Sequence, residues 1–356
     1  ACLYLSGYKD IQIEDIKNFR QLNSPTAGHP EYNELDGIET TTGPLSQGLA
    51  NSVGLAIAEK KLSHKFGADL FNHYTYVFAG DGCLMEGLSH ESCSLAGHLK
   101  LNKLIVFFDD NSISIDGPTN LSTSDDVKTR FKSYGWNVIS IDGHNFSEIT
   151  NAIIKSKKSN LPTLISCKTK IGYGSPNKES KSSSHGSPLG AEEVELTRKN
   201  LKWNNQPFDI PESLLFEWRS LANRNKETIL NWHKTNKSIL NSIEFKKMYN
   251  MDFDNKLSDA ILNFKKLHIN DNTSCATRKA SELSLELLSN YINNLIGGSA
   301  DLTGSNNTKT KTMSVLDSSN FNGNYIYYGV REHAMAAIMN GIALHGGLRP
   351  YGGTFL

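Results

Sequence analysis

The stretch His73-Tyr-Thr-Tyr-Val-Phe-Ala-Gly-Asp-Gly-Cys-Leu-Met-Glu-Gly87 places a glycine-flanked carboxylate directly after an apolar and aromatic run. A short apolar run of this kind predicts a buried strand, here residues 73–79. Glycines on both sides of Asp81 allow the backbone to approach a diphosphate closely, and the following helix directs its N-terminus at negative charge. The stretch therefore predicts a strand, a phosphate-binding turn and a helix, in that order.

Further apolar runs of the same length follow, and segments with helical spacing separate them. The predicted strands are residues 103–108, 136–141 and 163–167, and the predicted helices are 48–61, 91–101 and 147–157. Short apolar strands that alternate with helices are typical of a parallel sheet covered on both faces. We therefore expect a doubly wound α/β fold, which binds ligands at the carboxyl ends of its strands.

After Gly190 the sequence changes to exposed helices, predicted at 191–203 and 211–238, with Trp203, Trp218 and Trp232 as anchors. A second α/β pattern begins with a helix at 278–290 and strands at 294–297 and 325–328. We expect a first α/β domain with a helical extension over residues 1–240 and a linker over 241–274. Residues 275–356 then form the N-terminal part of a second, truncated α/β domain.

Composition excludes several classes of protein. Lys+Arg and Asp+Glu both number 37, and no basic stripe is visible, which argues against a nucleic-acid partner. No apolar run approaches the roughly 18–20 residues of a membrane span. The N-terminus has neither an initiator Met nor a basic region, so we expect a chain that begins within a domain. The five cysteines lack CxxC pairing, which favours a cytoplasmic protein.

Two oxygen-bearing side chains follow neighbouring strands and predict a metal site. Asp81 offers a carboxylate, and Asn111 follows the next predicted strand thirty residues later. Mg²⁺ prefers one or two protein oxygen ligands together with phosphate oxygens and water. A Gly-Asp-Gly turn alone is common, but the turn combined with this Asn is a specific signal for a metal-bound diphosphate.

These motifs, together with others in the same order along the chain, resemble transketolases. The matching segments are Gly28-His-Pro-Glu31, Thr41-Thr-Gly-Pro-Leu-Ser-Gln-Gly48, Ser114-Ile-Asp-Gly117, Ile171-Gly-Tyr-Gly174, Ser184-His-Gly186, Gly297-Gly-Ser-Ala-Asp-Leu302 and Tyr328-Gly-Val-Arg-Glu-His-Ala-Met335. The resemblance implies the thiamine-diphosphate-binding fold, with Mg²⁺ or Ca²⁺ held by Asp81, Asn111 and the backbone carbonyl of Ile113. It further implies cofactor contacts from Gly43, Leu45, Gly82, Glu86, Ile171, His185, Asp301 and Glu332.

The resemblance also assigns chemical roles. Glu332 is implied to bond N1′ of the aminopyrimidine, which promotes formation of the thiazolium ylid, and we expect this carboxyl to be partly buried. His29 and His185 are implied to contact substrate and to assist proton transfer, whereas Arg278 and Ser305 are implied to bind the sugar phosphate. Glu86 and Glu91 resemble an acidic relay between paired sites. Taken alone, each carboxylate would more often be a solvated residue on a helix.

The implied function is transketolase activity in the pentose phosphate pathway. A two-carbon ketol unit passes from a ketose phosphate, such as xylulose 5-phosphate, to an aldose phosphate, such as ribose 5-phosphate. Dihydroxyacetone synthase and deoxyxylulose-phosphate synthase remain open as related enzymes, and a non-catalytic binding subunit as a different class. The resemblance implies a homodimer with the site at the subunit interface, and we expect no membrane partner.

Two positions depart from the family pattern. Ser46 stands where the family usually has Gly, which matters only if that position needs a positive φ. Gly304 replaces a commoner Pro before Ser305. Family members also carry further segments at both ends, so we expect this chain alone to be inactive.

Overall fold

The computed structural model describes residues 1–250, 253 and 255–355. Its larger sheet contains β1 (Thr75–Gly80), β2 (Leu104–Asp110), β3 (Asn137–Asp142) and β4 (Thr163–Lys168). All pairs are parallel, and the order across the sheet is β1-β2-β4-β3. The apolar runs thus form the predicted strands within two residues at each end, and their carboxyl ends lie along one edge.

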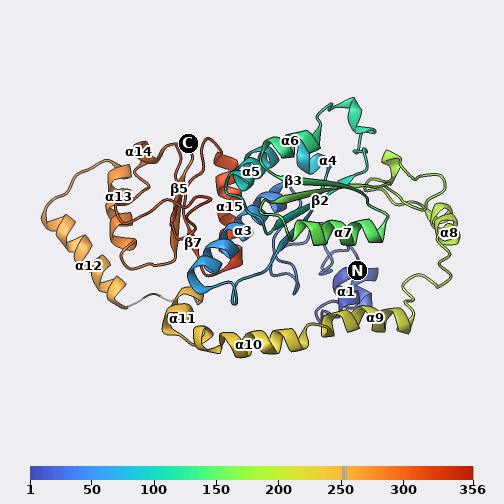
Figure 1. The fold of residues 1–356 in the computed structure, drawn as a ribbon, viewed down its shortest axis with the longest axis horizontal. Helices are drawn as coiled ribbons and strands as arrows, with labels where there is room; N and C mark the ends of the chain where they lie inside the picture. Colours follow the sequence, from blue (N-terminus) through green and yellow to red (C-terminus); the bar gives the residue numbers. More distant parts are fainter. Residues whose placement is uncertain (251–252, 254, 356) are drawn as a thin grey trace.

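Helices cover both faces of this sheet (Figure 1). α3 (Gln47–Phe66), α5 (Gly87–His98) and α6 (Val127–Ser133) lie on one face, and α7 (Phe146–Ser156) lies on the other. Alternate residues of β2 enter the two cores, because successive side chains of a strand point to opposite faces. Val106 packs with α3 and α5, and Phe107 packs with Ala152 of α7. The doubly wound α/β prediction is confirmed.

A series of helices leads away from this sheet, with the bounds α8 (Ala191–Asn200), α9 (Glu212–Asn223), α10 (Lys226–Leu240), α11 (Ile243–Tyr249) and α12 (Asn255–Asn270). α9 and α10 run along one side of the molecule, and the short α1 (Cys2–Ser6) lies beside α9 (Figure 1). Of the expected tryptophan anchors, only Trp232 packs inward, where its indole Nε1–H donates to the Leu70 carbonyl at 3.2 Å. Trp203 and Trp218 are 39% and 41% exposed, so their prediction as anchors is wrong.

The second unit has a smaller parallel sheet, ordered β6-β5-β7, with the bounds β5 (Leu295–Ser299), β6 (Tyr325–Tyr327) and β7 (Arg349–Pro350). Its helices are α13 (Thr277–Leu288), the short α14 (Thr303–Asn306) and α15 (Glu332–His345). α15 lies between the two sheets, directly beside α3 (Figure 1).

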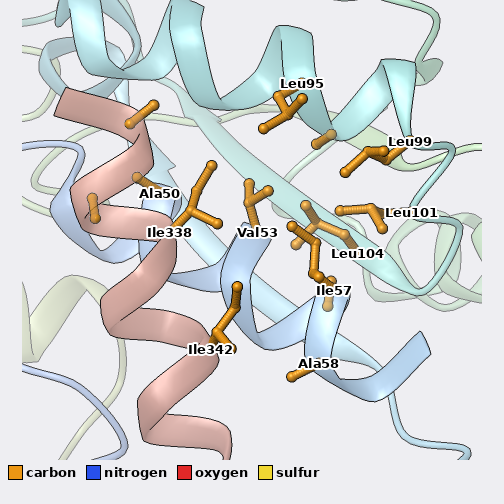
Figure 2. Close-up of a cluster of buried hydrophobic side chains, with 14 of the residues drawn as sticks. Ala50, Val53, Ile57, Ala58, Leu95, Leu99, Leu101, Leu104, Ile338 and Ile342 are labelled. Atoms are coloured by element: carbon orange, nitrogen blue, oxygen red, sulfur yellow. The ribbon is translucent and has the colours of Figure 1, made fainter. Parts of the chain in front are cut away.

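Two glycines allow α3 and α15 to cross closely. A Cβ added at Gly54 would lie 2.0 Å from the Ile338 carbonyl oxygen, and one added at Gly341 would lie 1.8 Å from that of Asn51. Around the crossing, Val53 and Ile57 of α3 pack with Ile338 and other buried residues in one continuous core (Figure 2). The two units are therefore joined by a shared core.

None of the helices in the described part of the chain has the length and apolar character needed to cross a membrane.

Candidate active site

Asp81 begins the short helix α4 (Asp81–Met85), directly after β1. Its Oδ2 atom is buried and has no hydrogen-bond partner within the described residues, and its carboxylate accepts the backbone N–H of Ser112. Burial, together with the nearby charges of Asp110 and Asp109, raises the pKa of Asp81 to about 6. A buried carboxylate oxygen without a partner, in a negatively charged surrounding, is suited to a cation.

The second half of this site follows β2. Gly80 and Asp109 are paired in the sheet, so the ends of β1 and β2 lie side by side. Past the strand, the Asn111 Oδ1 atom accepts the N–H of Ile113 at 2.9 Å, and Ser112 has the left-handed backbone φ of 62°. This tight turn brings Ser112 against Asp81.

The donor set at this edge fits a hard divalent cation. Asp81 supplies a carboxylate, Asn111 an amide oxygen and Ile113 a backbone carbonyl, and oxygen ligands of these kinds suit Mg²⁺ or Ca²⁺. Within residues 1–250, 253 and 255–355 there is no cluster of three His, Cys, Asp or Glu side chains arranged to hold a metal. A cavity of about 230 Å³ adjoins the site and is lined by Asp81, Asp110, Ser112 and Arg130, among others.

The Thr42–Leu45 turn lies against the Gly-Asp-Gly turn. A Cβ added at Gly82 would lie 3.2 Å from Leu45 Cδ1, and one added at Gly43 would lie 3.3 Å from the His29 side chain. The structure therefore brings together His29, Gly43, Leu45 and Gly82, which are far apart in sequence. Leu45 is 52% exposed, which leaves an apolar surface beside the turn.

Ser46, the next residue, has φ 68° and is 3% exposed. Its hydroxyl oxygen is buried and lacks a hydrogen-bond partner in the described part of the chain. The position thus has the positive φ that makes the departure from Gly significant.

The loops that contain Ile171 and His185 close on each other. The Ser180 N–H donates to the Ile171 carbonyl at 2.8 Å, and a Cβ added at Gly172 would lie 2.6 Å from Ser184 Oγ. His185 follows directly and is exposed to solvent. The structure therefore brings the two predicted residues into one loop cluster, without a contact of His185 to the Asp81 group.

The site residues of the second unit lie on its surface. Arg278 is exposed in the first turn of α13, and Ser305 is exposed in α14. Asp301 follows β5, is exposed and has φ 59°. Glu332 is the first residue of α15 and is exposed, so the partial burial expected for its carboxyl is not found in the single chain.

The start of α15 is nevertheless held by the first unit through contacts that the sequence did not predict. Gln47 Nε2 lies 2.8 Å from His333 Nε2, and the Ala334 N–H donates to Glu91 Oε2 at 2.9 Å. Arg331 Nη2 lies 3.2 Å from Ser94 Oγ. Glu91 therefore caps the helix that carries Glu332, while Glu86 is exposed. These contacts depend on how the two units dock, for which the sequence contains no local signal.

Comparisons with known proteins agree along the whole chain. Residues 1–255 match the family model of the transketolase thiamine diphosphate binding domain, and residues 273–356 match the transketolase pyrimidine binding domain. A transketolase of Cereibacter sphaeroides is 47% identical over 356 residues, which cover 100% of this chain and 54% of the relative. Transketolase 2 of Vibrio vulnificus is 50% identical over 370 residues, with 100% and 55% covered.

Solved structures give the same result. A Pichia stipitis transketolase in complex with sedoheptulose 7-phosphate has a TM-score of 0.91 and 38% identity, covering 99% of this chain and 54% of that one. A transketolase from Leishmania mexicana has a TM-score of 0.90 and 36% identity, covering 99% and 53%. The chain thus spans about half the length of the curated relatives it matches.

Proposed function

This chain belongs to the transketolase family, and we propose that it anchors thiamine diphosphate and a divalent cation in an enzyme that transfers a two-carbon ketol unit. The observation that carries the proposal is the buried Oδ2 atom of Asp81, which has no hydrogen-bond partner among the described residues and lies beside the turn that holds Asn111 and Ile113. A cation at this position would satisfy that oxygen, and the phosphate oxygens of the cofactor would complete its coordination.

The cofactor, when bound, supplies the electron sink that carbon–carbon bond cleavage and formation beside a carbonyl require. Gly82 and Gly43 leave room for close approach of the diphosphate, and the exposed Leu45 offers an apolar contact. Ile171, Glu86 and Asp301 are proposed as further cofactor contacts. Glu332 is proposed to hold the proton at N1′ of the aminopyrimidine.

The proposed substrates are sugar phosphates. The solved Pichia stipitis relatives, in complexes with xylulose 5-phosphate and sedoheptulose 7-phosphate, support this class. Arg278 and Ser305 would bind the phosphate, since a guanidinium and a hydroxyl are both hydrogen-bond donors to it. His29 and His185 would contact the substrate oxygens and transfer protons. Donor and acceptor are proposed to be xylulose 5-phosphate and ribose 5-phosphate.

The proposed working unit is a homodimer. Glu332 is solvent-exposed in the single chain, although its proposed role needs a closed environment, which a second copy would provide. We propose that Glu332 of one copy faces the cofactor held by Asp81 and Asn111 of the other. The proposed domains are residues 1–240 and 275–356 with a linker at 241–274. The five free cysteines support a cytoplasmic location.

The test is ketol transfer by the protein that carries this chain. Wild type, Glu332→Ala and the control Glu227→Ala, an exposed carboxylate on α10, are assayed with xylulose 5-phosphate, ribose 5-phosphate, thiamine diphosphate and Mg²⁺. We expect transfer by wild type and the control, and its loss in Glu332→Ala. Absence of transfer in wild type would contradict the proposed activity, and full activity of Glu332→Ala would contradict the proposed role.

A further inference from the structure

Lys168, the last residue of β4, reaches the turn that follows the neighbouring strand. Its Nζ atom lies 2.8 Å from Ser112 Oγ and 3.3 Å from Asp110 Oδ1. β4 pairs with β2 so that Lys168 stands opposite Asp110, which places the ammonium at the carboxyl edge of the sheet. One side chain thus contacts both the end of β2 and the turn beyond it.

Ser112 is the residue of this turn that needs support. Its φ of 62° lies in the left-handed region, which L-residues adopt rarely. In that conformation its N–H points to Asp81 and its carbonyl accepts the Thr119 N–H at 3.0 Å. The side-chain oxygen of Ser112 is held by Lys168. Lys168 therefore holds the side chain of Ser112, and Asp81 holds its backbone N–H.

The surrounding carboxylates are arranged by residues on β4 and directly after it. Asp110 Oδ2 accepts from Ser166 Oγ at 3.3 Å, and Asp109 accepts from the Thr169 hydroxyl. Asn111 Nδ2 donates to Asp109 Oδ2 at 3.1 Å, which orients the Asn111 amide. The end of β4 thus forms a polar frame around residues 109–112, and Lys168 contributes its positive charge.

We propose that Lys168 is a positioning residue for the cation site, which clamps the Ser112 turn so that Asn111 and Asp81 face one ion. This proposal rests on the proposed function, because it assumes a divalent cation at Asp81. Lys168 lies outside the sequence motifs that match the family, and its side chain is 63% exposed.

If the proposal is correct, removing Lys168 changes the affinity for a divalent cation in the direction opposite to that expected from charge repulsion alone. If Lys168 acted only as a nearby positive charge, its removal would strengthen binding of a divalent cation, since like charges repel. If Lys168 acts as a clamp, its removal weakens binding, because partners that orient metal ligands typically contribute about 10–100-fold in metal affinity. The direction of the change therefore separates the two roles.

The experiment measures Mn²⁺ binding to the purified protein that carries this chain, with thiamine diphosphate present, by electron paramagnetic resonance of the free ion. The variants are Lys168→Met, Lys168→Arg and the control Lys158→Met, an exposed lysine that precedes β4 at the opposite edge of the sheet. We expect Lys168→Met to raise the Mn²⁺ Kd by about tenfold. Lys168→Arg retains charge and donors, so its Kd should stay within about threefold of wild type, as should that of Lys158→Met.

Ser112→Ala provides a second route that leaves every charge in place. It removes the oxygen that Lys168 holds, so it should also raise the Kd, and combining it with Lys168→Met should add little. Unchanged or tighter Mn²⁺ binding in Lys168→Met, or unchanged binding in Ser112→Ala, would overturn the clamp. Failure of wild type to bind Mn²⁺ with thiamine diphosphate would instead contradict the proposed function, so the two failures are distinguishable.

Discussion

Replacing Ser46 by glycine is expected to stabilise this protein. Ser46 precedes α3 with φ 68° and ψ −9°, is 3% exposed, and buries a hydroxyl oxygen that has no partner in the described part of the chain. Two unfavourable features thus coincide at one residue. Glycine would relieve both, because it adopts positive φ without steric cost and has no hydroxyl.

The size of the effect follows from these two features. A left-handed conformation costs an L-residue roughly 1–2 kcal/mol, and an unsatisfied buried hydroxyl costs about 1–3 kcal/mol. Against this gain, glycine loses roughly 0.5–1 kcal/mol more conformational entropy on folding. The net gain for Ser46→Gly is therefore about 2 kcal/mol. Ser46→Ala removes only the hydroxyl and should gain about 1 kcal/mol.

The assay is urea unfolding of wild type and both variants, followed by tryptophan fluorescence and circular dichroism. The expected order of midpoints is Ser46→Gly above Ser46→Ala above wild type. A Ser46→Gly protein no more stable than wild type would show that the residue is not strained. A Ser46→Ala protein as stable as Ser46→Gly would assign the whole effect to the hydroxyl.

Three further perturbations test other parts of the structure. Gly341→Ala should lower the melting temperature, since overpacking the α3–α15 crossing costs roughly 1–3 kcal/mol. The control Gly87→Ala should not lower it, because a Cβ there meets open space. Equal effects of the two substitutions would contradict the close crossing of the helices. Glu91→Ala should destabilise by roughly 1 kcal/mol through loss of the Ala334 cap, and unchanged urea unfolding would contradict the cap. Hydrogen bonds from Ser175 and Asn177 hold the pKa of Glu193 at about 2, below its ordinary 4.5. The folded state therefore binds fewer protons than the unfolded state, and this stabilisation is lost as pH falls from about 4.5 to 2. Glu193→Gln should lack that part of the acid dependence, and an unchanged acid profile of unfolding would contradict it.

The strands were predictable because each is a short apolar run bounded by polar or glycine residues. Phe107 and Val106 enter different cores without any break in the run, which only a sheet covered on both faces allows. The boundary between α9 and α10, near Asn225, was not predicted, because it lacks the Gly or Pro that usually marks a helix end. Trp203 and Trp218 were misassigned because aromatic residues on helices are not always buried.

The contacts of the candidate site likewise fall into those that the sequence predicts and those that it does not. Asp81 and Asn111 follow consecutive strands, so their proximity follows from the parallel sheet alone. Lys168 reaches Ser112 only through the register of β4 on β2, with β4 inserted beside β2 although β3 comes first in the chain. Glu91 meets Ala334 only because α15 docks on α3. Contacts of this second kind depend on long-range packing, which local sequence patterns do not encode.

Calorimetric titration with thiamine diphosphate of the purified protein that carries this chain tests most directly whether Asp81 holds the cofactor through a metal ion. Binding should require Mg²⁺, should disappear in Asp81→Ala, and should persist in Asp259→Ala, where an exposed carboxylate of α12 is removed. The physical reason is that Asp81 supplies the buried oxygen that a cation-bound diphosphate would satisfy. Binding of equal affinity in Asp81→Ala, or in the presence of a chelator, would contradict the claim that this edge of the sheet holds the cofactor through a metal ion.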